Sequence, residues 1–532
     1  MPGQTVVAMH RLSNMVLAIL LAISAFLHVL PAAAQEKPQP WPTKEWTTSS
    51  PEEQGMSSER LARVVEFGGL NNMDSLLVTR HGRIVLEATY APFRAGLKHR
   101  INSSTKAVVS TLVAMAMRDG TLDNTDRKVM EFFADRTIAN LDDAKKAITI
   151  RHLLDMTSGL EWSEGLDGFR SFLEMERSPD WQQFVLDRPM SEAPGTRFYY
   201  DSGNSHLLSA ILTKVTGKSA LDYAREVLFG PLGIKDVMWR ADPQGISGGG
   251  AGLYMHPRDM AKIGYLYLHG GMWEGQQILP ASWIEGIRKA DVDMRETWTQ
   301  NLRYGSQFWV MPGRDAYMAV GYDRQLIVVI PKLDIVAVTT GSARFATASG
   351  LPSRPRYSFD SLVSFLTSAA SGDAPLPANP AATADLAQKV KEATIERPGP
   401  VGGQPAMAKT ISGKTWRFPP NDMRIKSITF TLASPEPSFE YEADGTPASP
   451  AARFGGPIGF DGHYRVGGRM RYGLAASRAR WLDDGTTLVL ETQTLGNDDL
   501  VRATHVFGDK TVEVKFEMAI GFQTTVSGRT DD

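Results

Sequence analysis

The chain has 532 residues, of which 42% are hydrophobic and 22% are charged, and it contains no cysteine. That length predicts two or three domains, and the ordinary globular composition excludes collagen-like, coiled-coil and wholly disordered chains. With 57 Lys and Arg against 59 Asp and Glu, the net charge of −2 gives no electrostatic reason to expect nucleic acid as a partner. The missing cysteines exclude disulfides, thiolate metal sites and a cysteine nucleophile.

The first 34 residues have the pattern of an export signal. A weakly basic start precedes an apolar run at 15–30, and small residues ending at Ala34 suit cleavage before Gln35. A retained membrane anchor is the alternative, but this run is short for a span of about twenty residues. We therefore expect residues 1–34 to be a cleaved signal peptide, which leaves a periplasmic or secreted protein without a membrane span.

The order of elements in residues 35–370 predicts an α+β domain. After a polar, Pro-rich start, we expect an amphipathic helix near 57–68 and a hairpin with strands at 76–78 and 84–86. A helix follows at 103–118, and residues 149–240 are mainly helical. The last expected elements are strands at 304–311, 317–320, 325–330 and 335–340 and a helix at 359–369. The sheet of this domain is thus completed from both ends of the domain.

The composition changes after residue 370. Residues 371–408 are rich in Pro, Ala and Gly, which predicts a linker with one short helical patch at 385–393. Residues 409–532 alternate with period two between Gly and Asp turns, which predicts a smaller antiparallel β-domain, a sandwich or a barrel. The expected core of this domain includes Trp416, Tyr464, Trp481 and Phe522.

Ser103 and Lys106 carry the strongest chemical signal. Three residues apart at the start of a helix, their side chains return to one face and can meet. A serine hydroxyl needs a base, and a lysine can be that base when burial and neighbouring groups lower its pKa. The helix N-terminus also offers N–H groups to an oxyanion. The spacing alone is not specific, because about one such pair is expected by chance in a chain of this composition.

Five further motifs, in a fixed order, give that pair its context. They are Thr149-Ile-Arg-His-Leu-Leu-Asp-Met-Thr-Ser-Gly-Leu160, Pro194-Gly-Thr-Arg-Phe-Tyr-Tyr-Asp-Ser-Gly-Asn-Ser-His-Leu-Leu208 with Val215-Thr-Gly217, Pro231-Leu-Gly-Ile234, Gly252-Leu-Tyr-Met-His-Pro-Arg-Asp-Met-Ala-Lys262 and Gly270-Gly-Met-Trp273. In this order they resemble the serine hydrolases related to class C β-lactamases, which include DD-peptidases, family VIII esterases and 6-aminohexanoate-dimer hydrolases. The resemblance spans about 57–370 and does not reach 410–532. It implies a β-lactamase/transpeptidase-like domain, with an antiparallel sheet flanked by helices and an all-helical region.

The resemblance implies a role for each matching residue. Ser103 matches the acylated nucleophile, and Lys106 matches its base or proton relay. Tyr200 matches the second-motif tyrosine, which exchanges a proton with the nucleophile or leaving group, and the adjacent Tyr199 is the alternative. Ser202 stands where many relatives have Asn and some have Ser. Because a tyrosine beside a cation can have a lowered pKa, the trio of serine, lysine and tyrosine is chemically consistent.

The third motif departs from many relatives. Where they carry Lys-Thr-Gly or His-x-Gly, this chain has Ala319-Val-Gly-Tyr-Asp-Arg-Gln325 and keeps only the glycine. The 6-aminohexanoate-dimer hydrolase branch also lacks the cation and keeps a Gln a few residues later, which favours that branch. A β-lactamase or carboxypeptidase is disfavoured, because the missing cation would help to hold a substrate carboxylate.

Gly321 and its neighbours are the expected oxyanion site. Gly321 allows a close backbone approach, and the resemblance implies that the Tyr322 N–H forms an oxyanion hole with the N–H of Ser103. Asp323 and Arg324 replace glycines that are common in relatives. They either narrow and charge the pocket or form a surface ion pair.

Two other patterns are weaker. Ser247 lies in a G-x-S-x-G pattern, but that motif needs a strand before it and a helix after it, and the glycines at 248–252 predict a loop. Four histidines could suggest a Ser-His-Asp triad: His152, His206, His256 and His269. None of them stands beside a candidate Ser and Asp, so we expect each to lie in the core or at the surface. The sequence has no metal-ligand spacing and no phosphate-binding glycine loop, so we expect no cofactor and no metal.

The sequence therefore predicts an exported serine hydrolase that cleaves an amide or ester bond of a small substrate through an acyl-enzyme on Ser103, with Lys106 and Tyr200 as base and acid. The expected oxyanion and substrate-binding residues are Gly321, Tyr322 and Ser202. Three alternatives stay open: a penicillin-recognising DD-peptidase-like protein, a sensor or binding module that is acylated without turnover, and a ligand binder driven by the β-domain. The substrate, the oligomeric state and the role of the β-domain are left open by the sequence.

Overall fold

In a computed structural model of the chain, the described residues are 41–164, 168–294, 301–345, 357–445, 452–470, 473–497, 500–519 and 521–531. The expected signal peptide lies outside them. None of the helices in these ranges combines the length and apolar content that crossing a membrane requires.

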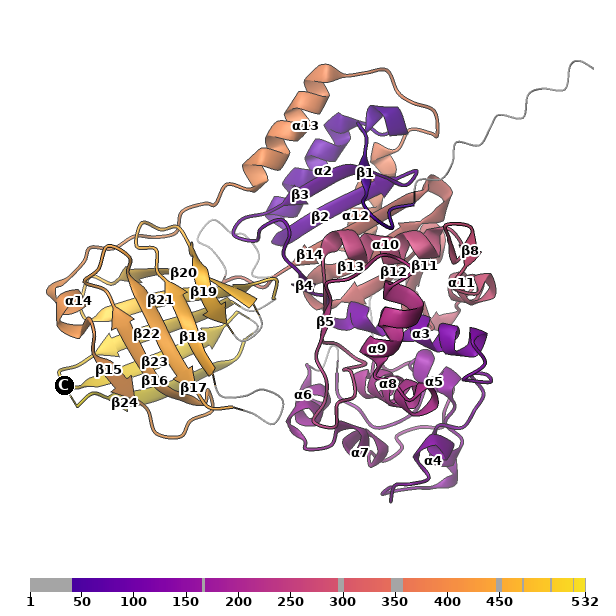
Figure 1. The fold of residues 1–532 in the computed structure, drawn as a ribbon, viewed down its shortest axis with the longest axis horizontal. Coiled ribbons are helices and arrows are strands. Elements are labelled where there is room, and N and C mark those ends of the chain that lie inside the picture. Colours follow the sequence, from indigo (N-terminus) through magenta and orange to yellow (C-terminus); the bar gives the residue numbers. More distant parts are fainter. Residues whose placement is uncertain are drawn as a thin grey trace, which may run out of the picture. The chain divides into compact units, whose positions relative to one another are not determined.

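A sheet of nine strands among the described residues is the frame of the first domain (Figure 1). Its order is β1-β3-β2-β14-β13-β12-β11-β10-β9. The strands are β1 Thr47–Thr48, β2 Met73–Arg80, β3 Arg83–Thr89, β9 Val292–Asp293, β10 Arg303–Gly305, β11 Phe308–Met311, β12 Ala316–Gly321, β13 Gln325–Ile330 and β14 Ile335–Gly341. All neighbours are antiparallel except the β1–β3 pair. Because β2 pairs with β14, the sheet is completed from both ends of the domain, as expected.

Two of the hairpins of this sheet are closed by tight two-residue turns. His81 and Gly82 join β2 to β3 with φ of 48° and 69°, the two positive values that a type I′ turn requires. Ser306 and Gln307 have φ of 48° and 67° and separate β10 from β11. The prediction of one strand over 304–311 is therefore wrong, because it read through a two-residue turn that contains no Gly, Asn or Asp.

Alternating strand residues enter two hydrophobic cores on opposite faces of the sheet. Along β13, Leu326 and Val328 lie in one core and Ile327 and Val329 in the other. The first core is covered by α2 Ser58–Leu70, α12 Phe359–Ala369 and α13 Pro380–Ala393, and the second by α3 Thr105–Arg118 and α10 Pro257–Leu268. Figure 1 shows α13 beside α2, which it contacts.

The middle of the chain supplies a mainly helical region. Its helices are α4 Asp143–Lys146, α5 Ile150–Leu154, α6 Arg170–Arg177, α7 Trp181–Leu186, α8 Ser202–Thr216 and α9 Ala220–Ala224, and α11 Ala281–Arg288 follows. The short strands are β4 His99–Arg100, β5 Met238–Trp239, β6 Leu253–Met255, β7 Met272–Trp273 and β8 Gln276–Gln277. Asp201 caps α8 by accepting the N–H groups of Gly203 and Asn204. The predicted combination of an antiparallel sheet, flanking helices and a helical region is confirmed.

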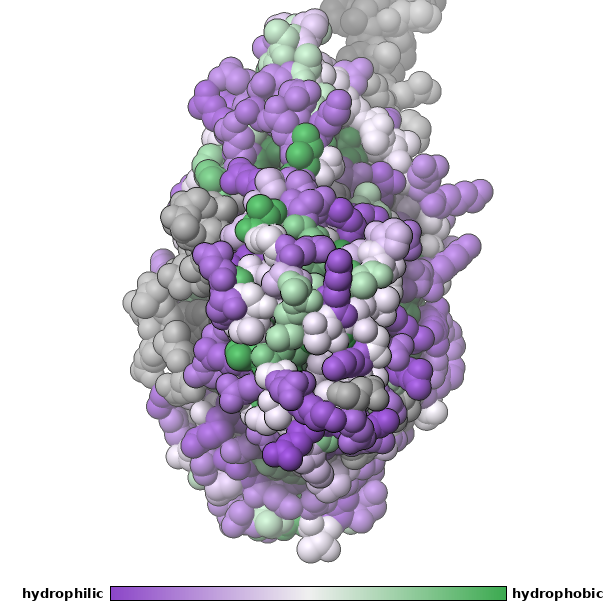
Figure 2. Space-filling model, turned by 90° about the vertical axis from the view of Figure 1, so that its left-hand side faces the viewer, coloured by the Kyte–Doolittle hydropathy of each residue, from purple (hydrophilic) through white to green (hydrophobic). Residues whose placement is uncertain are grey.

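The C-terminal β-domain is a closed antiparallel barrel, one of the two forms expected. Its strands, within the described residues, are β15 Thr415–Arg417, β16 Ile425–Thr431, β17 Ser438–Ala443, β18 Ala452–Pro457, β19 Arg465–Met470, β20 Gly473–Trp481, β21 Thr487–Leu495, β22 Leu500–Phe507, β23 Thr511–Met518 and β24 Gln523–Arg529. Trp416 and Trp481 lie in its core, as predicted. Phe522 does not, because it lies in the turn before β24 and is 40% exposed, and Tyr464 packs in a separate small cluster. Figure 2 shows a mainly hydrophilic outer surface with scattered hydrophobic residues.

The barrel contacts the first domain through β20 and β21, whose residues are buried on both faces of the barrel wall. Phe93 packs with Ala476 and Leu495, and Gln493 Nε2 donates to Ser342 Oγ at 3.0 Å. The segment expected as a linker contains α13 and the start of the short helix α14, Ala406–Ile411. Leu386 of α13 lies in the core that α2 covers, so part of that segment is packed structure.

Candidate active site

Ser103 lies on a tight turn that leads into α3. The turn, Asn102–Ser104, is 3-10 in form, and α3 itself begins at Thr105, two residues later than expected. Asn102 has a φ of 48°, a conformation that asparagine tolerates better than most residues. Ser104 Oγ donates to the carbonyl of Gln325 at 2.6 Å, which fixes the turn to β13. Ser103 itself is half-buried.

Lys106 meets Ser103 one helical turn later. Its Nζ lies 3.0 Å from Ser103 Oγ, 2.8 Å from Ser202 Oγ and 2.9 Å from the carbonyl oxygen of Gly250. The side chain is 1% exposed. Burial lowers the pKa of Lys106 from 10.5 to about 8, although the charges of Glu164 and Asp201 act in the opposite direction. A neutral amine is therefore accessible near neutral pH.

The three partners of Lys106 fix the direction of its lone pair. A neutral amine has two N–H groups and one lone pair. The Gly250 carbonyl can only accept a hydrogen bond, and Ser202 Oγ must also accept, because its own proton is donated to Glu164 Oε1 at 2.6 Å. The lone pair is left facing Ser103, the one partner that has a proton to give.

Tyr200 lies beside this pair. Lys106 Nζ is 4.7 Å from the centre of the Tyr200 ring, and the Tyr200 hydroxyl hydrogen bonds to Ser103. Tyr199 packs instead against the neighbouring hydrophobic core, so Tyr200 is the tyrosine that reaches the site. Burial, with the charge of Glu164, raises the pKa of Tyr200 well above 10. The expectation of a lowered tyrosine pKa is thus wrong, because burial and the charge of Glu164 outweigh the hydrogen bond with Ser103, and Tyr200 stays a proton donor.

Glu164 is a buried carboxylate that the sequence analysis missed. Its two oxygens accept from the Ser202 hydroxyl at 2.6 Å and the Ser202 N–H at 2.9 Å, and Trp162 Nε1 donates to it at 2.7 Å. Thirty-eight residues separate Glu164 from Ser202. No local motif links them, and only the fold of the helical region brings them together.

The third motif lies against the turn that carries Ser103. A Cβ added to Gly321 would stand 2.3 Å from the carbonyl oxygen of Ile101, so only glycine fits there. Asn102 Nδ2 donates to the carbonyl of Tyr322 at 3.1 Å. The Gln325 amide bonds both the N–H and the carbonyl of Gly341, which ties the end of this motif to β14.

Asp323 and Arg324 do not form the surface ion pair that was one of the two alternatives. Arg324 turns away from the site, where its guanidinium lies 4.5 Å from the centre of the Phe359 ring and donates to the Tyr357 carbonyl at 3.1 Å. Asp323 is buried with a φ of 54°. The two residues therefore shape the turn after β12 and do not form a surface ion pair.

A family model described as Beta-lactamase matches residues 70–351. The chain belongs to the beta-lactamase family. The match contains all six candidate site residues, which are Ser103, Lys106, Tyr200, Ser202, Gly321 and Tyr322. It ends before the first strand of the barrel. Membership of this family makes the protein a serine hydrolase, as the order of its motifs predicted.

Curated relatives of this beta-lactamase-family protein are distant. The 6-aminohexanoate-dimer hydrolase of Paenarthrobacter ureafaciens is 24% identical over 291 residues, which cover 51% of this chain and 72% of that protein. Monacolin J acid methylbutanoyltransferase of Aspergillus terreus is 26% identical over 164 residues, 28% of this chain and 40% of that protein. A solved structure from Bacillus anthracis, provisionally named a 6-aminohexanoate-dimer hydrolase, is similar with a TM-score of 0.50 and 20% identity, and covers 62% of this chain and 89% of that one. That likeness shows the fold.

In this beta-lactamase-family protein, Ser247 and the four histidines considered above have other surroundings than the Ser103 cluster. Ser247 is 2% exposed, lies in a loop, and its Oγ accepts from the backbone N–H of Leu221 at 3.2 Å. His206 is buried against Asp242, with Nε2 3.1 Å from a carboxylate oxygen. His152 accepts from the N–H of Thr149 at 3.1 Å, and His269 packs against the rings of Trp41 and Tyr265. His256 lies near the surface, paired with Asp236.

Proposed function

We propose that this protein is an exported hydrolase that cleaves an amide or ester bond of a small substrate through an acyl-enzyme on Ser103. The observation that carries the proposal is the set of contacts at Lys106 Nζ. Two of its partners can only accept hydrogen bonds, and the third is the hydroxyl to be activated. An amine held in this way has its lone pair directed at the proton that a nucleophilic serine must lose.

Acylation follows from these positions. Lys106 takes the proton of Ser103, and Ser103 Oγ forms a bond with the substrate carbonyl carbon while the carbonyl pair moves to oxygen. The N–H groups of Ser103 and Tyr322 are the proposed donors to that oxyanion. When the intermediate collapses, the bond to the leaving amine or alcohol breaks, and the leaving group takes a proton from Tyr200. Tyr200 then regains a proton from Lys106, which the first step left protonated and which lies beside Tyr200.

Hydrolysis of the acyl-enzyme uses the same groups. Water loses a proton to Lys106, adds to the acyl carbon, and Ser103 leaves with a proton returned by the lysine. The two curated relatives support acyl chemistry of this kind, since one is named as a hydrolase of an amide dimer and the other as an acyltransferase. The lack of a cation in the third motif favours substrates that carry no carboxylate beside the scissile bond.

The proposed organisation is a signal peptide at 1–34, a catalytic domain at 35–370, a connecting segment at 371–408 and the β-domain at 409–532. The apolar run and the small residues before Gln35 support export. Fractionation of cells that express the full chain, followed by N-terminal sequencing, tests this proposal. Intact residues 1–34 on a cytoplasmic protein would contradict it.

Pre-steady-state kinetics with p-nitrophenyl esters, anilides and a chromogenic cephalosporin tests the proposed reaction. We expect a burst of one product per active site followed by steady turnover on at least one ester or anilide, and neither phase in Ser103→Ala. A burst without turnover on every substrate would support the sensor alternative. Turnover confined to the cephalosporin would support a penicillin-recognising protein.

A further inference from the structure

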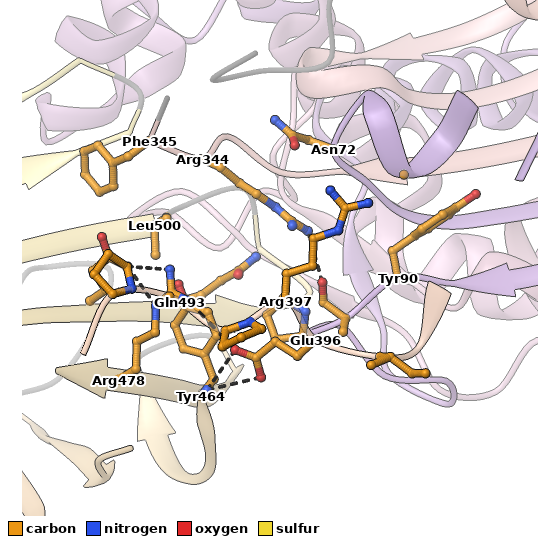
Figure 3. A pocket seen from close by; sticks show the side chains of 18 of the residues that line it. Asn72, Tyr90, Arg344, Phe345, Glu396, Arg397, Tyr464, Arg478, Gln493 and Leu500 are labelled. Carbon is orange, nitrogen blue, oxygen red and sulfur yellow. Dashed lines mark hydrogen bonds and ion pairs between the residues drawn. The ribbon is translucent and has the colours of Figure 1, made fainter. Parts of the chain in front are cut away.

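A cavity away from the Ser103 cluster lies between the outer face of the barrel and the end of β14. Its volume is about 820 Å³, within the range of roughly 300–1,000 Å³ that is typical of small-molecule sites. Figure 3 shows Arg344, which follows β14, and Arg397, which precedes the barrel, reaching into it. None of the six candidate site residues lines this cavity.

Part of the cavity wall is a cluster in which one glutamate holds two arginines. Glu491 accepts from Arg478 through one carboxylate oxygen, at 2.9 and 3.0 Å, and from Arg502 through the other, at 2.7 and 3.1 Å. The two guanidinium groups also stack on rings, with Arg478 4.5 Å from the centre of Tyr464 and Arg502 3.8 Å from that of Phe345. Rigid, oriented guanidinium groups of this kind are preorganised for oxyanions.

The cavity lining as a whole carries a net positive charge. Five arginines and three glutamates line it, a difference of two charges. The side chains of Arg397 and Arg480 have no hydrogen bond or ion pair with the residues that the structure describes. In contrast, Glu396 accepts from the N–H of Tyr464, and Glu392 lies 3.8 Å from Lys389, which is not part of the lining. An anion in the cavity would be attracted by both Arg397 and Arg480, neither of which has a counter-charge among the described residues.

Arg344 adds an unused donor. Its Nη2 lies 3.3 Å from Asp74 and 3.5 Å from the carbonyl of Ala91, while its Nε is buried with no hydrogen-bond partner among the described residues. A buried N–H without an acceptor costs free energy, roughly 1–3 kcal/mol, unless a ligand or water supplies one.

We propose that this cavity binds a small organic oxyanion, a carboxylate or a phosphate, held by Arg344, Arg397 and Arg480. Apolar residues complete the wall, among them Leu500 and Val489 on the barrel, and suit a ligand with an apolar body. The site is separate from the Ser103 cluster, so it would hold a ligand in addition to the substrate.

Isothermal titration calorimetry of the full-length protein with citrate and with inorganic phosphate, at constant ionic strength set by chloride, tests the proposal. We expect saturable one-site binding of at least one anion, weakened at least about tenfold in Arg397→Gln and in Arg480→Gln. Binding of citrate alone identifies a carboxylate site, and binding of phosphate alone a phosphate site.

Arg469→Gln is the matched control, because Arg469 is an exposed barrel arginine that does not line the cavity. The affinity of Arg469→Gln for the anion should equal that of the unmodified protein. Failure of both anions to bind saturably, or an equal loss in the control variant, would overturn the proposal. None of the three substitutions touches the Ser103 cluster, so turnover without added anion should be unchanged in all three variants.

Discussion

Lys106 sets the expected pH dependence of the reaction. Its neutral form is the base, and burial lowers its pKa to about 8, so kcat/KM should fall about tenfold per pH unit below that value and level off above it. Lys106→Arg keeps the charge but cannot lose it near neutral pH, and should lower kcat by roughly 10²–10⁴. A pH–rate profile of both proteins is the measurement. A flat profile from pH 5 to 9 would contradict the role of Lys106.

Glu164 is expected to act through Ser202 as a positioning residue. In Glu164→Gln the amide can donate to Ser202 Oγ, which frees the serine proton to compete for Lys106, and kcat should fall about 10- to 100-fold, part of what proton transfer contributes. The lost negative charge also removes a contribution that raises the pKa of Lys106, so the acid limb of the profile should move to lower pH.

Glu161→Gln is the control for that experiment, because Glu161 is a half-exposed carboxylate close in sequence that pairs with Arg188. It should leave both kcat and the profile unchanged. A loss of activity in Glu164→Gln without any shift of the profile would indicate a purely structural role.

At the level of single residues, the sequence predicted the nucleophile, the lysine and the tyrosine as candidates, and the structure brings all three within contact. Each belongs to a local motif whose spacing is visible in the chain. Glu164 and Gly250 could not be found in that way, because their partners are distant in sequence. The direction of the Tyr200 pKa was also mispredicted, because burial is a property of the folded chain.

Among the elements, the approach of β12 to the Ser103 turn is the most constrained. Gly321→Ala would place a Cβ 2.3 Å from the Ile101 carbonyl oxygen, and separating these two backbones should lower kcat by roughly 10²–10³, as the loss of an oxyanion donor does. Gly313→Ala, where an added Cβ meets nothing within 4 Å, is the control and should keep full activity. Steady-state kinetics decides, and full activity in Gly321→Ala would contradict this placement of the oxyanion site.

Elements whose apolar residues recur at regular spacing were predicted well. Elements interrupted by a turn or extended by a cap were predicted less well. The helix over Phe359–Ala369 was predicted with its observed bounds, since its apolar residues recur at helical spacing. The turn at Ser306 and Gln307 was missed because neither residue type signals a positive φ. Helix α13 is longer than the expected patch because Asn379 caps it and Pro380 begins it.

For the whole molecule, the contact of the barrel with the first domain depends on Phe93, which is 4% exposed and packs with Ala476 and Leu495. Phe93→Ala should lower the free energy of unfolding by about 3 kcal/mol, the usual cost of emptying a buried aromatic site. It should also speed limited proteolysis within 371–408. Phe522→Ala removes an exposed aromatic from the barrel and should change stability by about 0.5 kcal/mol or less. Equal stability of the two variants would show that this contact contributes nothing.

The central claim is that Ser103 is the nucleophile. Reaction of the full-length protein with a fluorophosphonate probe, followed by peptide mapping by mass spectrometry, tests it most directly. We predict one modified serine, Ser103, with labelling that slows sharply in Lys106→Arg and is absent in Ser103→Ala. A label on Ser247 or on any other serine, or undiminished labelling of Ser103→Ala, would contradict the account.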